Sequence, residues 1–276
     1  MRTLLKIVLA LGLALSVAGC SANEAADSGQ GEVTVVKVGV VGAYNDQWDT
    51  VNELLKDDNI QVELVYFSDY ALPNKALDSG DIDLNAFQHH AYLENEVAEY
   101  GYDIVAIGDT IIAPLGLFNN KDKITSVDQI QDGDQIGIPS DATNGGRALK
   151  ILEELGLIVC DPQAGEMPTV GDITEKIVDI DIVELESGML ASALPDLTAA
   201  LINGGNAITA GLNPTTDAIY VETIGENVDR LKNVIAARTE DQDNEIYRKV
   251  VEAYQTDEVA QTLQDSYQGA FLPAWQ

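Results

Sequence analysis

Cysteine, basic residues and membrane-length apolar segments are scarce or absent in this chain, and each shortage excludes a class of protein. Two cysteines in 276 residues cannot form a disulfide framework. Only 15 Lys and Arg residues stand against 46 Asp and Glu residues, which gives a net charge of −31. A chain so poor in cations cannot displace counterions from phosphates, so nucleic-acid binding is excluded. The N-terminal apolar run, residues 7–18, is too short to span a bilayer, which argues against a polytopic membrane protein.

Sequence motifs of common enzymes are also missing. The chain contains no HExxH, GxSxG, GxxxxGK[ST], GxGxxG or CxxC pattern. The adjacent His89 and His90 would point about 100° apart on a helix, so they cannot both bind one metal ion. We therefore expect no catalytic residues, no metal site and no cofactor. The enzyme alternative that remains is an extracytoplasmic hydrolase with His89 as its base.

The N-terminus has the features of a secreted lipoprotein. Arg2 and Lys6 precede the apolar run, and the residues Val-Ala-Gly-Cys at 17–20 resemble a bacterial lipobox. We predict a signal peptide over 1–19, lipidation of Cys20, and a polar tether over 20–32. An ordinary signal peptide with a coincidental cysteine is the alternative. The lipoprotein interpretation places the protein on the extracytoplasmic face of the cell membrane, held there by its acyl chains.

The body of the chain alternates strand and helix patterns, which is typical of α/β proteins with parallel sheets. A long apolar segment around 111–118 and a Gly- and Pro-containing segment over 209–220 are candidate crossovers between two lobes. We expect one lobe over 33–112 and 218–276 and the other over 113–217. The predicted strands are 33–41, 61–67, 82–86, 135–138, 180–185, 198–202, 218–222 and 233–237, and the predicted helices are 46–56, 73–78, 88–100, 144–155, 243–254 and a shorter one after 257.

Aromatic residues, which make up only 6 % of the chain, are concentrated in residues 66–92. This window holds five of them (Tyr66, Phe67, Tyr70, Phe87 and Tyr92) together with both histidines. Several lie where predicted strands end, and the carboxyl ends of strands are where open α/β sheets bind ligands. One of the pair Tyr66 and Phe67 belongs to the core, whereas Tyr70 and Phe87 are candidates for a pocket wall.

A second candidate binding element covers 139–147, with the sequence PSDATNGGR. It follows a predicted strand and opens a helix, for which Thr143 or Asn144 is the expected N-cap. Such a helix start favours anions, and Arg147 offers a planar guanidinium suited to a carboxylate. A surface arginine on the first turn is the simpler alternative. An aromatic wall opposite a carboxylate clamp would form a receptor for an apolar amino acid.

Two longer motifs are FSDYALPN at 67–74 and GDIDLNAFQHHAYL at 80–93. Together with 139–149, 156–158, 183–186 and 202–212, these motifs resemble the methionine-binding lipoproteins of the NlpA/MetQ family. The resemblance implies a two-lobed periplasmic-binding-protein fold of type II, with parallel-rich sheets flanked by helices and two crossover hinges. It also implies delivery of the ligand to an ABC transporter permease.

The same resemblance implies which residues bind the ligand. Aromatic side chains around the thioether fall on Tyr70, Phe87 and Tyr92, with His89 beside them. The carboxylate clamp falls on Arg147, assisted by Asn144, and two asparagines that hold the amino-acid backbone fall on Asn203 and Asn233. The sequence departs from the family pattern at Asn206, where a tyrosine is usual, and at 187–190, where SGML replaces a basic or proline-rich stretch.

Methionine, as the L-isomer, is thus the expected ligand and a monomer the expected state. Another amino acid or a methionine-containing dipeptide remains an alternative ligand, and a surface adhesin or antigen is an alternative role. Cys160 is expected to be a packed side chain rather than a reactive thiol.

Overall fold

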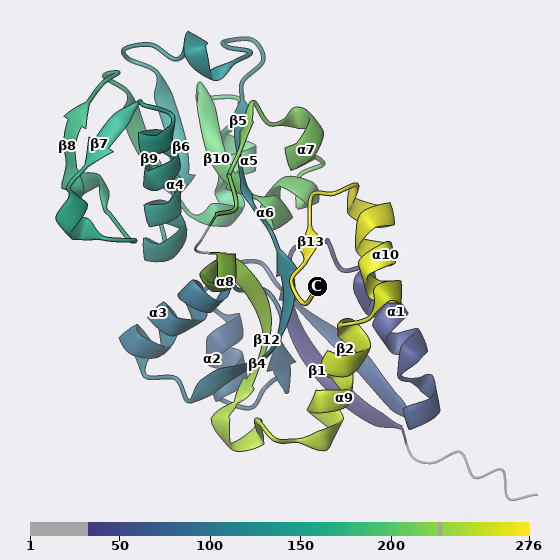
Figure 1. Cartoon of the computed structure of the whole chain (residues 1–276). Helices are drawn as coiled ribbons and strands as arrows, with labels where there is room; N and C mark the ends of the chain where they lie inside the picture. Colours follow the sequence, from purple (N-terminus) through teal and green to yellow (C-terminus); the bar gives the residue numbers. More distant parts are fainter. Residues whose placement is uncertain (1–32, 226–227) are drawn as a thin grey trace, which may run out of the picture. The chain divides into compact units, whose positions relative to one another are not determined.

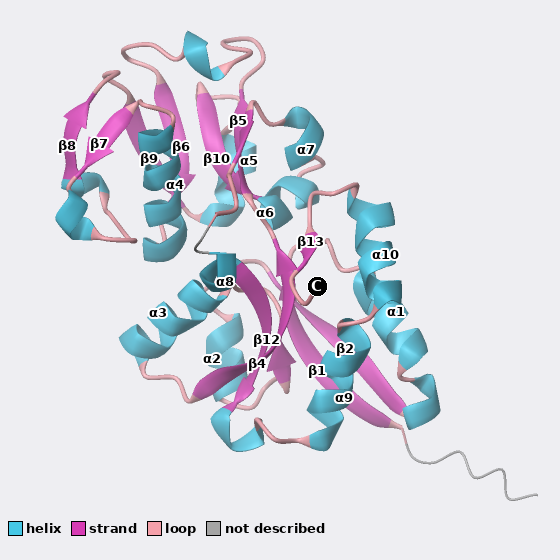
Figure 2. Ribbon diagram, viewed as in Figure 1, coloured by secondary structure: helices cyan, strands magenta, loops and turns pink. Residues whose placement is uncertain are grey.

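Two β-sheets, each covered by helices on both faces, organise residues 33–225 and 228–276, which are the residues that the computed structural model describes (Figures 1 and 2). The predicted signal peptide, Cys20 and the tether lie outside the described residues. We call the part of the chain built on the six-stranded sheet the first lobe. The part built on the five-stranded sheet is the second lobe.

The first lobe has the strand order β13-β4-β12-β3-β1-β2. Helices α1, α9 and α10 pack on one face of this sheet around Trp48 and Tyr254, and α2 and α3 pack on the other around Leu77 and Leu93. The strands are β1 (Thr34–Val41), β2 (Ile60–Phe67), β3 (Leu84–Asn85), β4 (Ile104–Ile112), β12 (Lys232–Arg238) and β13 (Leu272–Pro273). The helices are α1 (Gln47–Leu54), α2 (Pro73–Asp78), α3 (His90–Tyr100), α8 (Val228–Leu231), α9 (Glu245–Tyr254) and α10 (Asp257–Tyr267).

The second lobe has the strand order β11-β5-β10-β6-β9, with the separate hairpin β7-β8. Helix α4 covers one face of the sheet through Leu149 and Leu152, and α5 and α6 cover the other through Leu190 and Ala207. The strands are β5 (Leu115–Asn119), β6 (Gln135–Pro139), β7 (Ile158–Cys160), β8 (Ile173–Lys176), β9 (Asp181–Leu185), β10 (Ala199–Asn203) and β11 (Tyr220–Val221). The helices are α4 (Ala142–Glu154), α5 (Leu190–Ala193), α6 (Gly204–Thr209) and α7 (Pro214–Asp217).

The sheets are mixed, with two parallel pairs of neighbouring strands in each sheet and the remaining pairs antiparallel. Strands β2, β1 and β3 pair in parallel, as do β9, β6 and β10. The other pairs, which involve β4, β5, β11, β12 and β13, are antiparallel. Hydrophobic periodicity reports that a segment is a strand, but it carries no information about the direction of the strand's neighbour.

One lobe boundary also differs from the prediction. Tyr220 and Val221 pair with β5, so β11 belongs to the second lobe, and the return crossover begins at Glu222 rather than before residue 218. The first crossover is the short link Ala113–Pro114 between β4 and β5. The backbone joins the two crossovers, because the Glu222 N–H donates to the Leu115 carbonyl at 2.9 Å.

Helix termini follow local sequence signals, with one exception. Pro73 opens α2, and Gly101 ends α3 with a φ of +73°, a value that favours glycine. Helix α4, however, is capped by Asp141, whose Oδ1 accepts from the Asn144 N–H at 2.9 Å, and not by Thr143 or Asn144 as expected. The helix therefore starts early enough to place both Asn144 and Arg147 on its inner side.

Candidate binding site

A small cavity lies between the two lobes and is lined by residues of both. All eight residues that were predicted from the sequence to bind the ligand lie in the lining of this cavity. They are Tyr70, Phe87, His89, Tyr92, Asn144, Arg147, Asn203 and Asn233. The strand ends and the start of α4 therefore converge on one place, although the role of each side chain stays a prediction.

One wall of the cavity is aromatic. Tyr70, Phe87 and Tyr92 form a triangle with ring centroids 5.8 to 6.0 Å apart, backed by Val41 and Phe67. The Tyr92 hydroxyl donates to the Tyr70 carbonyl at 3.2 Å, which fixes the loop that follows β2. This wall offers ring faces and edges to an apolar or thioether side chain.

His89 links the aromatic wall to the second lobe. Its Nδ1 accepts from the Tyr92 N–H at 3.0 Å, which caps α3. Since Nδ1 accepts, the ring proton of the neutral form lies on Nε2, which then donates to Asn144 Oδ1 at 3.2 Å. Burial, together with the nearby Arg147 charge, lowers the pKa of His89 to about 3, so the ring is neutral at physiological pH.

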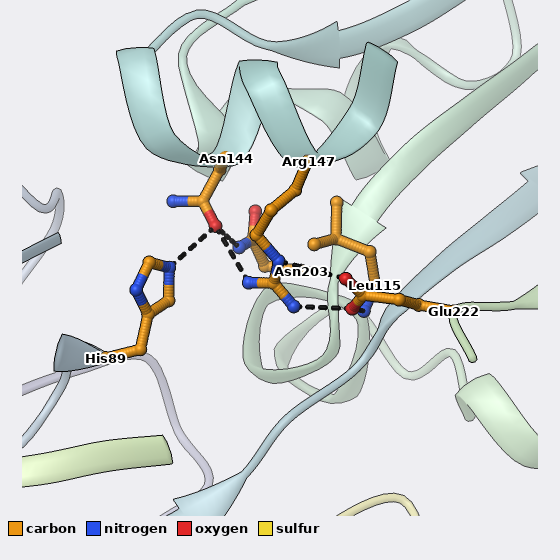
Figure 3. Close-up of polar contacts among 6 residues, drawn as sticks. All are labelled: His89, Leu115, Asn144, Arg147, Asn203 and Glu222. Atoms are coloured by element: carbon orange, nitrogen blue, oxygen red, sulfur yellow. Dashed lines mark hydrogen bonds and ion pairs between the residues drawn. The ribbon is translucent and has the colours of Figure 1, made fainter. Parts of the chain in front are cut away.

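Asn144 is the centre of a polar network in which one amide oxygen serves three donors (Figure 3). Its Oδ1 accepts from His89 Nε2, from Arg147 Nη1 at 3.2 Å and from Asn203 Nδ2 at 2.9 Å. Its Nδ2 donates to the two oxygens of Asp141 at 3.0 and 3.1 Å. Asn144 is therefore engaged on both sides, and it organises the site rather than offering a free donor to a carboxylate.

Arg147 does not face solvent, so the simpler alternative of a surface arginine does not hold. Its side chain is only 10 % exposed and forms a two-point ion pair with Glu222. Nε donates to Oε1 at 3.1 Å, and Nη2 donates to Oε2 at 2.5 Å. With Nη1 bonded to Asn144, two of the five N–H groups of the guanidinium have no partner among the residues that the structure describes and are left for a ligand.

Asn203 lines the cavity and has an unsatisfied acceptor. Its Oδ1 is buried and has no hydrogen-bond partner within residues 33–225 and 228–276. Buried polar atoms of this kind are rare, because leaving an acceptor unpaired costs about 1–3 kcal/mol. A donor such as an ammonium group would satisfy it. Asn233, the other predicted asparagine, also lines the cavity and pairs with His89 through the backbone.

Sequence reasoning missed several residues of the site. Tyr44 follows β1 as Tyr70 follows β2, so the same strand-end signal would have found it. Its ring lies against Gly205, where an added Cβ would come within 2.4 Å of the ring. Gln88 and Ala113 also line the cavity. Asn206, the departure noted above, donates to the Tyr70 hydroxyl at 3.1 Å and so connects the lobes beside the aromatic wall.

Other residues discussed in the sequence analysis do not line the cavity. Tyr66 is 63 % exposed, whereas Phe67 packs in the core, as expected for one of the pair. His90 binds Asp109 at 2.8 Å, away from His89. Cys160 is buried. No cluster of three metal-binding side chains occurs in the part of the chain that the structure describes, and no helix in that part is long and apolar enough to cross a membrane.

The acid-side stability of the fold should depend on His89. A histidine with a pKa of about 3 when folded and about 6.5 when unfolded contributes nothing above pH 6.5 and opposes folding as the pH falls below it. His89→Asn, which keeps a capping side chain, should therefore remove a slope of up to about 1.4 kcal/mol per pH unit between pH 6 and 4. Urea unfolding of both proteins over this range measures it.

The comparison with the variant is needed because another group titrates in the opposite sense. Burial raises the pKa of Glu96 to about 7, so its contribution to stability grows as the pH falls from 7 towards its unfolded value. The difference between wild type and His89→Asn cancels this term. Parallel curves for the two proteins would show that His89 is not the group responsible.

A two-lobed α/β fold with a small, partly aromatic and partly polar cavity between its lobes defines a small-molecule-binding protein of the periplasmic-binding type. The sequence pattern of the NlpA lipoprotein family matches residues 36–275. The chain therefore belongs to this family, and the predicted family and fold class are confirmed.

Relatives and solved structures agree with this assignment. The D-methionine-binding lipoprotein MetQ of Escherichia coli K12 is 38 % identical over 265 residues, covering 95 % of this chain and 94 % of that protein. A nutrient-binding protein from Burkholderia cenocepacia bound to methionine superposes with a TM-score of 0.82 at 36 % identity, covering 87 % and 99 % of the two chains. The substrate-binding protein of a methionine transporter from Streptococcus pneumoniae gives a TM-score of 0.83 at 35 % identity, covering 87 % and 96 %.

Proposed function

We propose that this protein is the substrate-binding lipoprotein of an ABC importer and that it binds methionine in the cavity between its lobes. The observation that carries the proposal is the chemical division of that cavity. A guanidinium with two unused N–H groups and an amide oxygen without a partner lie at one end, and three aromatic rings form the wall at the other. The names of the relatives reported above support the same ligand.

Each part of a zwitterionic amino acid has a counterpart in this cavity. The α-carboxylate takes the two remaining N–H groups of Arg147, in the strong charge-assisted geometry that a guanidinium provides. The α-ammonium donates to Asn203 Oδ1 and thereby removes an unsatisfied buried acceptor. The thioether lies against Tyr70, Phe87 and Tyr92, where contacts between sulfur and a ring contribute about 0.3–1.5 kcal/mol each.

Binding without catalysis follows from the same geometry. His89 is the one candidate base among the lining residues, and its two ring nitrogens are engaged by Tyr92 and Asn144. Its lowered pKa also makes it a poor base near neutral pH. A hydrolase built around His89 is therefore the weaker hypothesis.

Delivery to a permease and anchoring through Cys20 complete the proposal. The anchor rests on the lipobox at 17–20, which lies outside the described residues. If Cys20 carries the acyl chains, Cys20→Ser should release the protein from the membrane fraction, and labelling with radioactive palmitate should fail. Retention and labelling of the variant would show that the anchor is elsewhere.

Titration calorimetry of the ligand-free protein with L-methionine, D-methionine and alanine tests the binding proposal. In this direct comparison we expect L-methionine to bind more tightly than D-methionine, although the E. coli relative is named for the D-isomer. Native mass spectrometry of the protein as purified should show a retained ligand of methionine's mass. No heat with either isomer and a different retained mass would favour another amino acid or a methionine-containing dipeptide.

Replacing Phe87 with alanine should weaken methionine binding more than alanine binding. Phe87 is 4 % exposed and contacts both neighbouring rings, so its loss removes wall area that only a long side chain touches. We expect a loss of about 1–1.5 kcal/mol for methionine, or roughly five- to tenfold, and much less for alanine. Tyr66→Ala, which removes an exposed ring from the same region, is the matched control. Equal losses for both ligands would remove Phe87 from the side-chain wall.

A further inference from the structure

Glu222 occupies a position that the binding site described above leaves unexplained. It is the first residue after β11, at the start of the return crossover, and its side chain is 10 % exposed. Its carboxylate accepts from Nε and Nη2 of Arg147, and Oε2 also accepts from the Leu115 N–H at 3.0 Å (Figure 3). Glu222 does not line the cavity that holds the predicted ligand-binding residues.

The three contacts connect parts of the protein that are distant in sequence. Arg147 lies on α4, Leu115 begins β5 immediately after the first crossover, and Glu222 begins the second crossover. A backbone hydrogen bond from the Glu222 N–H to the Leu115 carbonyl runs alongside the side-chain bond. One carboxylate thus joins the guanidinium to both connections between the lobes.

The charge balance explains why a carboxylate is needed here. A guanidinium that is nine-tenths buried requires a charged partner, because neutral amides compensate its desolvation only in part. Asn144 supplies one neutral acceptor. Glu222 supplies the charge, and its two-point geometry fixes the plane of the guanidinium as well as its position.

The direction of the free N–H groups follows from this arrangement. Because Glu222 takes the edge formed by Nε and Nη2, the N–H groups left for a ligand lie on the terminal nitrogens, on the side that Asn144 and the cavity share. A rotated guanidinium would present a different edge and lose a two-point contact with a ligand carboxylate.

We infer that Glu222 is a positioning residue that holds the Arg147 guanidinium in its carboxylate-binding orientation and ties it, through the Leu115 amide, to both crossovers between the lobes. The inference rests on the proposed function in one respect, namely that Arg147 receives the ligand's α-carboxylate. Glu222 itself does not touch the ligand.

Glu222→Gln is the test variant, because it keeps the size of the side chain and removes its charge. A glutamine cannot accept from Nε, Nη2 and Leu115 at once, since one of its two terminal atoms is a donor. Glu94→Gln is the matched control. Glu94 also pairs with an arginine, Arg230 at 3.3 Å, but both of these side chains are well exposed.

The first measurement uses ligand-free protein and does not depend on the ligand's identity. In wild type and Glu94→Gln, NMR should show a slowly exchanging Arg147 Nε–H and a protected Leu115 amide. In Glu222→Gln we expect the exchange of both protons to be faster by about tenfold or more, the change expected for losing about 1.4 kcal/mol of a charge-assisted bond. Unchanged exchange of both protons would overturn the proposed tie between the arginine and the crossovers.

The second measurement compares methionine with methioninamide, which lacks the carboxylate charge. Wild type should prefer methionine strongly, and Glu222→Gln should reduce that preference by about tenfold. A general loss of stability would weaken both ligands equally and leave the ratio unchanged, which would overturn the positioning role. If wild type binds neither ligand, the proposed function fails, while the exchange measurement still decides whether Glu222 holds the guanidinium and the crossovers together.

Discussion

Methionine binding by Arg147→Ala should be weaker than wild-type binding by at least about 2 kcal/mol, or roughly 30-fold, in a calorimetric titration. The physical reason is that the ligand's carboxylate would be buried without a charged partner. The substitution also leaves the Glu222 carboxylate unpaired close to the site, which adds repulsion to the loss of attraction. Among residues 33–225 and 228–276, no other Arg or Lys side chain lines the cavity to replace it.

Two controls separate this effect from a general loss of stability. Arg230→Ala removes an exposed guanidinium from the other arginine–glutamate pair and should leave the affinity unchanged. Arg147→Ala combined with Glu222→Gln removes the unpaired charge and should recover much of the melting temperature without recovering methionine binding. If Arg147→Ala binds methionine as tightly as wild type, Arg147 is not part of the site.

Asn144→Ala is the second substitution with a large expected effect, because it should reduce both stability and affinity. Removing the amide leaves the donors of His89, Arg147 and Asn203 without their common acceptor. Unpaired buried donors cost about 1–3 kcal/mol each, and water entering the space left by the amide offsets part of that cost. We expect the free energy of unfolding to fall by about 2–4 kcal/mol and methionine affinity to fall at least tenfold.

Urea unfolding and calorimetry on the same preparations measure the two effects of Asn144→Ala. Asn52→Ala provides a control, because Asn52 makes two partly buried hydrogen bonds with the N–H and the carbonyl of Val62 but does not line the cavity. That variant should lose stability and keep its affinity. An Asn144→Ala protein with wild-type affinity would show that the network supports folding but does not organise the site.

The Asn144 network gives the two lobes a direct polar connection at the cavity. His89 belongs to the first lobe, whereas Asn144 and Asn203 belong to the second. Further hydrogen bonds between the lobes join Asn206 to Tyr70 and the Ala43 N–H to Thr209. A ligand held between these contacts would touch both lobes at once, as expected where domain closure surrounds a ligand.

Strand and helix locations were largely predictable because they depend on local patterns. The β-branched run of β1, the proline that opens α2 and the glycine that ends α3 act over a few residues, and the structure has each where the sequence indicated it. The hairpin β7-β8 was missed, since its strands are short and β8 is largely exposed. Helix α10 is as long as its neighbours rather than shorter, because its apolar positions continue to Tyr267.

The sequence by itself determined the family, the fold class and most of the side chains that surround the cavity, because strand ends, a helix start and long motifs mark them locally. Only the tertiary structure decided how those side chains are paired. Arg147 and Glu222 are 75 residues apart, Asn144 and Asn203 are 59 apart, and Tyr70 and Asn206 are 136 apart. No periodicity reports such pairs, because a hydrogen bond depends on where two elements meet in space, and the packing of the two sheets and their helices sets that.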